Sequence, residues 1–281
     1  MTERMLSVNG IDLCAETFGS PDDPAVLLVM GATGSMLLWE DDFCARPAAH
    51  GRHVIRYDHR DTGRSTAYPP GEPGYAFEDL VADAVGVLDA LGVARAHVVG
   101  LSMGGGIGQL IALEHPERVL TLTLVAAGPT GPGHPDLPPV APSPVAHFAA
   151  GGTPEPDWSS RESVVEHLVA AERPFRGPRP VDEDAARAPA GRVFDRSPHP
   201  ASAANHTRLG GDGPWRHRLG EVRARTLVLH GDADPLVPPG HGEAPAAEIP
   251  DATLVVLPDT GHELPRGVWD LVIERLVEHT A

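Results

Sequence analysis

The sequence predicts an α/β domain built around a mostly parallel β-sheet. Short apolar runs, as expected for buried strands, alternate with longer stretches whose apolar residues have helical spacing. The alternation stops after Gly128 and resumes near residue 225, which indicates an insertion. A chain of 281 residues is long enough for one large domain that carries such an insertion.

The first half of the chain supplies most of the expected elements. Residues 5–8 and 11–18 form a predicted hairpin, because Asn9-Gly10 between them is a strong turn signal. Continuous apolar runs predict strands buried on both faces, and a 3.6-residue apolar period predicts helices. The expected strands are 25–31, 53–58, 96–102 and 120–128, and the expected helices are 77–93 and 103–119, the second of which stops at Pro116.

Proline marks the insertion. Sixteen of the 30 prolines fall between Pro129 and Pro214, mixed with short helical stretches at 160–174 and 183–194. Strands at 225–234 and 252–262 and a last helix near 265–279 then restore the alternation. We therefore expect a core of residues 1–128 and 220–281, and an inserted, proline-rich, partly helical cap of residues 129–219. Insertions of this kind often cover a site and set its shape.

Composition excludes several classes of function. The formal charge is −17, and all 22 basic residues are arginine, so we expect no nucleic-acid partner and no binding to anionic membranes. No apolar run reaches the length of a membrane span, and the N-terminus lacks the layout of a signal peptide. Cys14 and Cys44 are too few for a disulfide framework and fit a reducing cytosol, so we expect a cytoplasmic protein.

The stretch VVGLSMGGGIG, residues 98–108, contains the candidate nucleophile. Ser102 lies between Gly100 and Gly104 in a G-x-S-x-G pattern that follows a predicted strand and precedes a predicted helix. A sharp turn there exposes the serine, small flanking residues let the backbone approach closely, and the helix N-terminus favours negative charge. The alternative is a plain glycine turn with a capping serine. The context favours a catalytic Ser102.

A serine hydroxyl needs a base, and position selects one of the 15 histidines. His262 follows the last predicted strand, so its loop lies at the same carboxyl edge of the sheet as Ser102. His50 and His53 precede a strand, and His115 lies late in a helix. The insertion holds His134, His147, His167, His199, His206 and His217. We predict that His262 is the base.

The acid should orient the histidine and follow the serine in the chain. Asp232 and Asp234 end the preceding strand, and we favour Asp234 because the G-x-x-D-P turn places it just past the strand end. Asp232 is then a turn residue that binds local backbone. Asp58 and Asp61 precede the serine and violate the expected order.

Attack on a carbonyl also needs two preorganised N–H donors for the oxyanion. One is expected from Met103, the residue after the nucleophile, and the other from Ala32, in the loop after LLVMG.

The segment Gly104–Gly106 lacks the G-x-G-x-x-G spacing of dinucleotide sites, and no cluster has metal-ligand spacing. We therefore expect neither a cofactor nor a metal.

With these residues identified, the sequence resembles the α/β-hydrolase superfamily over nearly its whole length outside the insertion. More narrowly, it resembles the aclacinomycin methylesterase group of actinomycete polyketide pathways. The resemblance rests on LLVMG (27–31), HVIRYDHRDTGRS (53–65), AHVVGLSMG (96–104), Asp234-Pro235 and GHELP (261–265). It implies an eight-stranded, mostly parallel sheet with a helical cap, a triad of Ser102, Asp234 and His262, and an oxyanion hole formed by the backbone of Ala32 and Met103.

Two positions depart from the superfamily. Met30 stands where most members have histidine, and Asp61 replaces the first glycine of the common D-x-R-G-x-G-x-S loop. The methylesterase group shares both changes, and neither touches the triad. The sequence thus predicts a cofactor-independent serine hydrolase that cleaves a carboxylic ester of small or medium size, such as a polyketide-type methyl ester.

Other chemistry remains open at the level of sequence. The same triad serves lactonases, enol-lactonases and perhydrolases, and some proteins of this fold are cyclase-like or bind ligands without hydrolysis. The oligomeric state is not encoded in any motif of the chain.

Overall fold

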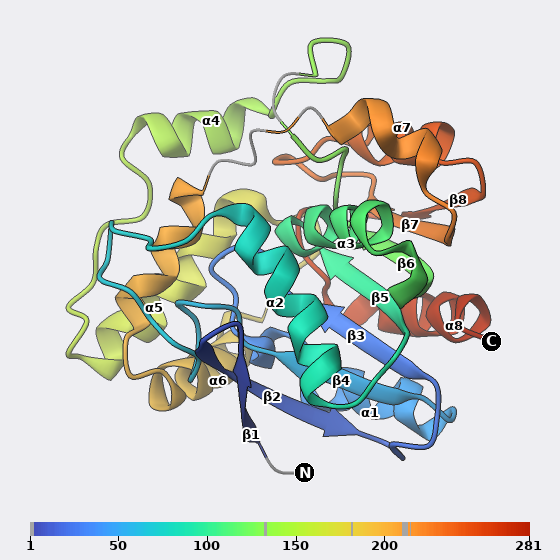
Figure 1. Ribbon diagram of the computed structural model, residues 1–281. Coiled ribbons are helices and arrows are strands. Elements are labelled where there is room, and N and C mark those ends of the chain that lie inside the picture. The colour runs from blue at the N-terminus through green and yellow to red at the C-terminus, as the bar shows by residue number, and fades with distance from the viewer. Residues whose placement is uncertain (1–2, 132–133, 181, 210–212, 214) are drawn as a thin grey trace.

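In the described part of the chain, eight strands form a single sheet in the order β1-β2-β4-β3-β5-β6-β7-β8 (Figure 1). The computed structural model describes residues 3–131, 134–180, 182–209, 213 and 215–281. β1 pairs antiparallel with β2 and β2 with β4, and every other pairing is parallel. The strands are β1 (Arg4–Val8), β2 (Ile11–Phe18), β3 (Ala25–Val29), β4 (His53–Tyr57), β5 (Ala96–Leu101), β6 (Val119–Val125), β7 (Arg225–Gly231) and β8 (Ala252–Leu257).

Helices cover both faces of this sheet (Figure 1). α2 (Phe77–Ala90), α3 (Met103–Glu114) and α7 (Gly240–Glu248) lie over one face, and α1 (Asp41–Ala49) and α8 (Trp269–His279) lie over the other. A separate apolar cluster fills each interface. Strands β3 and β4 are buried along their whole length, which explains why their sequences are continuous rather than alternating apolar runs. This three-layer arrangement confirms the predicted fold class.

The predicted elements are present, with shorter strands than the apolar runs suggested. Outside the insertion, two of the described helices, α1 (Asp41–Ala49) and α7 (Gly240–Glu248), were not expected from the sequence. Each contains an internal proline, Pro47 and Pro245, which sequence reasoning takes as a helix breaker. Packing against the sheet stabilises both helices in spite of this loss of a backbone hydrogen bond. The last regular helix begins at Trp269, after the 3₁₀ turn η6 (Arg266–Val268).

The segment between β6 and β7 is helical and irregular. Its elements are α4 (Pro142–Ala149), α5 (Arg161–Glu172), η3 (Arg173–Phe175), α6 (Glu183–Arg196), η4 (Pro200–Arg208) and η5 (Trp215–Glu221). α5 and α6 pack together around a small cluster of Val165, Val169 and Ala190. These helices lie beyond the carboxyl ends of the strands (Figure 1). The expected boundary of the cap at residue 219 falls inside η5, whose Leu219 packs into the core.

Two buried ion pairs connect distant parts of the fold. Arg60 donates two hydrogen bonds to Asp83 on α2, and both side chains are nearly inaccessible to solvent. Arg196, on α6, pairs with the buried Asp58 after β4, at 2.6 Å. Because Asp58 also accepts a hydrogen bond from the Met36 N–H, this pair joins the insertion to the loop after β3. The insertion is therefore anchored on the core close to the ends of β3 and β4.

Candidate active site

Ser102 occupies the turn between β5 and α3. Its backbone angles are φ 53° and ψ −116°, a left-handed conformation that non-glycine residues rarely adopt. The Ser102 N–H donates to Val125 O at 2.9 Å, and its carbonyl accepts from the N–H groups of Gly105 and Gly106 at 2.8 and 3.2 Å. These bonds hold the strained backbone of Ser102 at the N-terminus of α3. Figure 1 shows that this helix begins at the carboxyl edge of the sheet.

Close backbone contacts explain the two glycines that flank the serine. A Cβ atom at Gly100 would lie 2.1 Å from the carbonyl oxygen of Gly104. A Cβ atom at Gly104 would lie 2.1 Å from the carbonyl oxygen of Val29, at the end of β3. The G-x-S-x-G pattern is thus a steric requirement of a turn in which β3, β5 and α3 meet without side chains between them.

His262 connects the serine to an acid. The Ser102 Oγ–H donates to Nε2 of His262 at 2.8 Å, and the Nδ1–H of His262 donates to Oδ2 of Asp234 at 2.8 Å. The side chain of Asp234 is fully buried, and that of His262 is only 9% exposed. A neutral imidazole with its proton on Nδ1 therefore presents a free lone pair to the serine hydroxyl.

The structure separates the two candidate acids. Asp234 also accepts hydrogen bonds from the N–H groups of Leu236 and Val237 at 3.0 and 2.8 Å, which fix its carboxylate toward His262. Asp232 instead accepts from the N–H of Thr260 at 3.4 Å. The position that sequence reasoning favoured is the one in contact with the histidine.

A second histidine, His230, lies behind the acid and was not considered in the sequence analysis. Its Nε2–H donates to Val237 O at 2.7 Å, and the same nitrogen is 3.8 Å from Oδ2 of Asp234. Burial lowers the pKa of His230, which favours its neutral form. It shapes the loop that holds Asp234. The sequence feature that could have identified His230 is its position near the end of strand β7, four residues before Asp234.

The loop after β3 lies against the serine. An ideal Cβ at Gly31 would be 3.4 Å from the Cβ atom of Ser102, so the two backbones are in close contact. Gly34 N–H donates to Gly31 O at 3.3 Å and closes a turn whose third residue, Thr33, has φ 64°. Within the described residues, the N–H of Ala32 has no hydrogen-bond acceptor, and the N–H of Met103, the first residue of α3, has no acceptor within its helix. Both donors are available beside Ser102.

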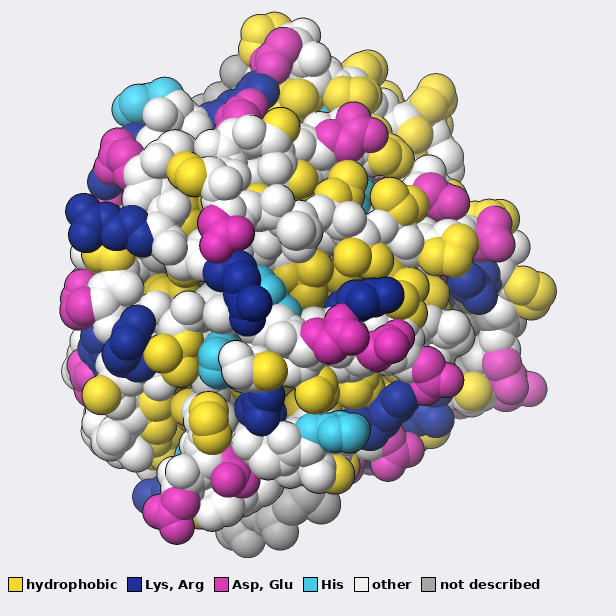
Figure 2. Space-filling view, turned by 90° about the vertical axis from the view of Figure 1, so that its right-hand side faces the viewer, with side chains coloured by type: hydrophobic (Ala, Val, Ile, Leu, Met, Phe, Trp, Pro, Cys, Tyr) yellow, Lys and Arg dark blue, Asp and Glu magenta, His cyan; other side chains and the backbone are white. Residues whose placement is uncertain are grey.

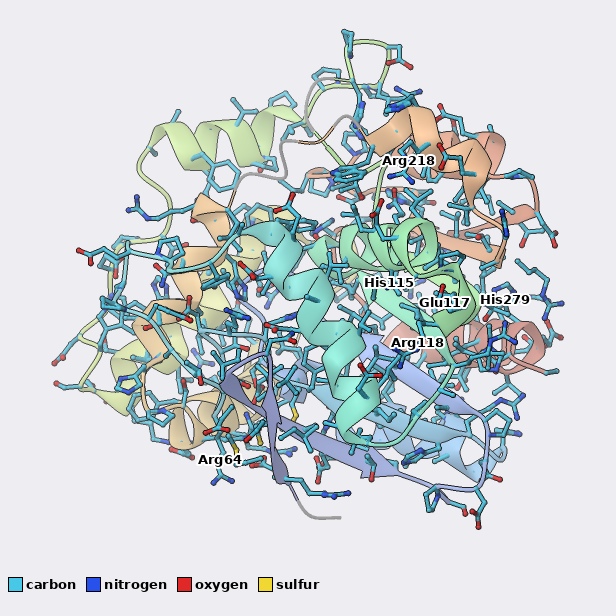
Figure 3. The ribbon with its side chains drawn as sticks, in the orientation of Figure 1. Arg64, His115, Glu117, Arg118, Arg218 and His279 are labelled. Atoms are coloured by element: carbon cyan, nitrogen blue, oxygen red, sulfur yellow. The ribbon has the colours of Figure 1, made fainter. Side chains whose placement is uncertain are left out.

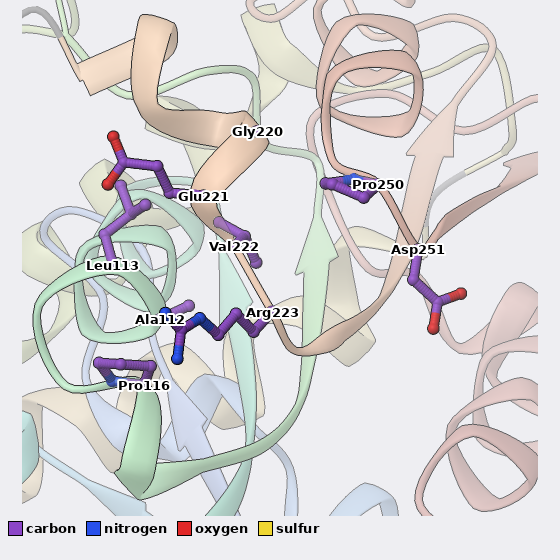
Figure 4. A pocket seen from close by; sticks show the side chains of 9 residues that line it. All are labelled: Ala112, Leu113, Pro116, Gly220, Glu221, Val222, Arg223, Pro250 and Asp251. Atoms are coloured by element: carbon purple, nitrogen blue, oxygen red, sulfur yellow. The ribbon is translucent and has the colours of Figure 1, made fainter.

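Other histidines and cavities lie elsewhere. His115 and His279 lie at the side of the molecule away from the carboxyl ends of the strands (Figure 3). A cavity of about 620 Å³ opens at the far end of α3, opposite to Ser102, and Figure 4 shows its lining. Among its lining residues are Ala112 and Leu113 on α3, Glu221 at the end of η5, and Pro250. This cavity contains none of the residues of the candidate site.

Further features of the part of the chain that the structure describes concern metal-ligand clusters, membrane-spanning helices and surface charge. Over the described residues, no group of three or more histidine, cysteine, aspartate or glutamate side chains is placed to hold a metal ion. None of the described helices is long and apolar enough to cross a membrane. On the face shown in Figure 2, arginine side chains are interspersed with acidic ones.

Comparison with known proteins identifies the family. The model of the alpha/beta hydrolase fold matches residues 24–265. The chain is 33% identical to the rhodomycin D methylesterases DauP of Streptomyces sp. (strain C5), over an alignment of 302 positions, and DnrP of Streptomyces peucetius, over one of 300. Each alignment covers 100% of this chain and 98% of the relative, the insertion included. An esterase from Exiguobacterium antarcticum superposes with a TM-score of 0.81 at 21% identity, covering 99% of both chains. The chain therefore belongs to the α/β-hydrolase family.

Proposed function

We propose that this protein is a cofactor-independent serine esterase that cleaves a carboxylic ester through an acyl-enzyme. The observation that carries the proposal is the continuous hydrogen-bonded chain from Ser102 through His262 to Asp234, with 2.8 Å at each step. Nucleophile, base and orienting acid in this arrangement activate a serine hydroxyl for attack on a carbonyl.

Acylation follows from this geometry. The Ser102 hydroxyl gives its proton to Nε2 of His262 as Oγ attacks the ester carbonyl. The tetrahedral oxyanion accepts hydrogen bonds from the N–H of Ala32, which has no acceptor among the described residues, and from the N–H of Met103 at the start of α3. The C–O bond of the ester then breaks, and His262 gives the proton to the departing alkoxide, which leaves as an alcohol. Asp234 holds the imidazole in position and stabilises its transient positive charge.

Deacylation repeats the same steps with water. His262 takes a proton from a water molecule, whose oxygen attacks the acyl carbon bound to Ser102. The second tetrahedral intermediate collapses, Oγ of Ser102 recovers its proton from His262, and a carboxylic acid is released. No step needs a redox group or a metal.

A methyl ester of a polyketide-type product is the substrate class we propose. The support is the name of the two full-length relatives, methylesterases that match this chain at 33% identity. We further propose that residues 129–219 form a cap over the site. In support of this, the backbone N–H of His262 donates at 2.8 Å to the carbonyl oxygen of Phe175, which belongs to that segment.

We expect a small-molecule substrate and no nucleic-acid partner, because acidic residues outnumber basic ones by 39 to 22. We also expect the protein to act in the cytoplasm, where the buried free thiols of Cys14 and Cys44 stay reduced.

The test is hydrolysis of p-nitrophenyl esters from acetate to octanoate, and of a polyketide methyl ester, by the wild-type protein and by Ser102→Ala. We expect turnover by the wild type and a loss of at least about 10³-fold in the variant, with an unchanged fold by circular dichroism. Full activity in Ser102→Ala would contradict the proposal. Hydrolysis of lactones alone or peroxide-dependent halogenation would assign the same triad to a different reaction. Ligand binding without product would identify a binding protein with this fold.

A further inference from the structure

The loop that supplies the Ala32 N–H is conformationally strained. Thr33, the next residue, has φ 64°, a conformation that costs free energy for a β-branched side chain. Its Oγ1–H donates to the carbonyl oxygen of Ala32 at 2.6 Å. Both Ala32 and Thr33 are exposed, so packing of their own side chains does not hold the turn. A strained, exposed turn persists only when surrounding groups fix it.

His206 supplies that support from the segment between β6 and β7. It lies in η4 and is only 4% exposed. The Thr33 N–H donates to Nδ1 of His206 at 2.9 Å, and the Nε2–H of His206 donates to the carbonyl oxygen of Arg60 at 2.8 Å. Since Nδ1 accepts and Nε2 donates, the ring is neutral and present as one tautomer. Burial also lowers the pKa of His206.

His59 holds the other end of the same loop. Its Nε2–H donates to the carbonyl oxygen of Met30 at 3.0 Å, and its ring lies edge-on to that of His206, with the ring centres 5.8 Å apart. The Ala32 amide therefore lies between two backbone groups, Met30 O and Thr33 N–H, that are each bound by a buried imidazole. This arrangement leaves the loop little freedom to shift.

We propose that His206 is a positioning residue for the oxyanion-binding amide of Ala32, so that the inserted segment takes part in catalysis as well as covering the site. The inference rests on the proposed function. An oxyanion hole works because its donors are fixed before the reaction, and a displacement of about 1 Å can cost on the order of 10²-fold in rate. The bond from Thr33 N–H to His206 fixes the peptide next to the Ala32 donor.

Two substitutions distinguish the contributions of the two hydrogen bonds that the ring of His206 makes. In His206→Asn, the amide oxygen can take the place of Nδ1 and accept from Thr33, whereas the bond to Arg60 is lost. In His206→Gln, the longer amide can take the place of Nε2 and donate to Arg60, whereas the acceptor for Thr33 is lost. We expect His206→Gln to lower kcat for p-nitrophenyl acetate by on the order of 10- to 100-fold with KM nearly unchanged, and His206→Asn to retain most of kcat.

Ser202→Ala is the matched control. Ser202 lies in η4 as well and is buried, but its Oγ–H donates to Tyr68 O and not to the loop of residues 30–34 that carries the Ala32 N–H. This variant should lower the melting temperature without lowering kcat. If Ser202→Ala and both His206 variants lose kcat in proportion to stability, η4 has a structural role alone and the inference is wrong.

Two further measurements distinguish this inference from the proposed function. A boronic acid whose adduct with Ser102 places an oxygen in the oxyanion hole should bind His206→Gln more weakly, by the same factor as the loss of kcat. In the wild type, ¹⁵N NMR of His206 near neutral pH should show the neutral Nε2–H tautomer. This measurement needs no variant to fold. Normal kcat in folded His206→Gln, or an Nδ1–H tautomer, would overturn the inference while leaving the esterase proposal intact. An inactive wild type would overturn both.

Discussion

Nε2 of His262 lies 2.8 Å from Oγ of Ser102, although 160 residues separate them in the chain. Ser102 directly follows β5 and His262 follows β8, so strands β6 and β7 lie between them in the sheet. The contact exists because both loops leave the carboxyl edge of a parallel sheet. From the inserted segment, the carbonyl oxygen of Phe175 accepts a hydrogen bond from the backbone N–H of His262 at 2.8 Å and so adds a further contact to this loop.

Asp234→Asn should abolish most activity while preserving the fold. The amide can donate to Nδ1 of His262, which favours the tautomer with its proton on Nε2, and that nitrogen then cannot accept the proton of Ser102. We expect kcat to fall by on the order of 10⁴-fold. Asp232→Asn is the control, because Asp232 binds the N–H of Thr260 instead. Steady-state kinetics of the two variants test whether Asp234 is the acid that orients His262, and an equal loss of kcat in both would contradict that role.

Ser102→Gly should be more stable than Ser102→Ala, although both should be inactive. The backbone at residue 102 has φ 53° and ψ −116°, which glycine adopts at little cost and alanine does not. Relief of this strain is worth about 1–3 kcal/mol of unfolding free energy. Urea denaturation of the two variants measures the difference. Equal stability would show that the turn stores no strain.

Acid should destabilise the protein partly through His59. Burial lowers the pKa of His59 to about 3 in the folded chain, against an ordinary value near 6.5. Between these values the unfolded chain binds the proton more strongly, so stability falls as the pH falls from about 6.5 toward 3. In His59→Gln, which can still donate to Met30 O, the loss between pH 7 and pH 5 should be smaller by about 1–2 kcal/mol.

The comparison for His59 is His50→Gln, at an exposed position. Urea unfolding of the wild type and both variants at several pH values measures how the free energy of unfolding changes with pH. Parallel curves for the wild type and His59→Gln would show that His59 is not the group that titrates.

Asp83→Ala should be strongly destabilising. Asp83 is fully buried and accepts hydrogen bonds from Asn9 and from two nitrogens of Arg60. Removal of one partner leaves the charge of Arg60 buried without compensation, at a cost of about 3–5 kcal/mol. The control is Asp195→Ala, which breaks the exposed pair with Arg161 and should change stability far less. Comparable losses in chemical denaturation would contradict this ranking.

The sequence by itself determined the local chemistry of the fold. Apolar runs predicted strands such as β3 and β5 because a strand buried on both faces cannot alternate. The glycines around Ser102 predicted a tight turn, since only glycine allows the backbone contacts found there. The order of serine, acid and histidine, with each after a predicted strand, predicted that Ser102, Asp234 and His262 lie together, because the carboxyl ends of parallel strands share one edge.

Only the tertiary structure decided which distant side chains support that site. Nothing in the sequence near His206 distinguishes it from the other histidines of the insertion, since its partners Thr33 and Arg60 are 173 and 146 residues away. The same holds for Asp61, which replaces a glycine at φ 67° and accepts hydrogen bonds from Tyr75 and Asn205. Local propensity and spacing do not encode contacts of this range, because they form only when the inserted helices pack against the ends of the strands.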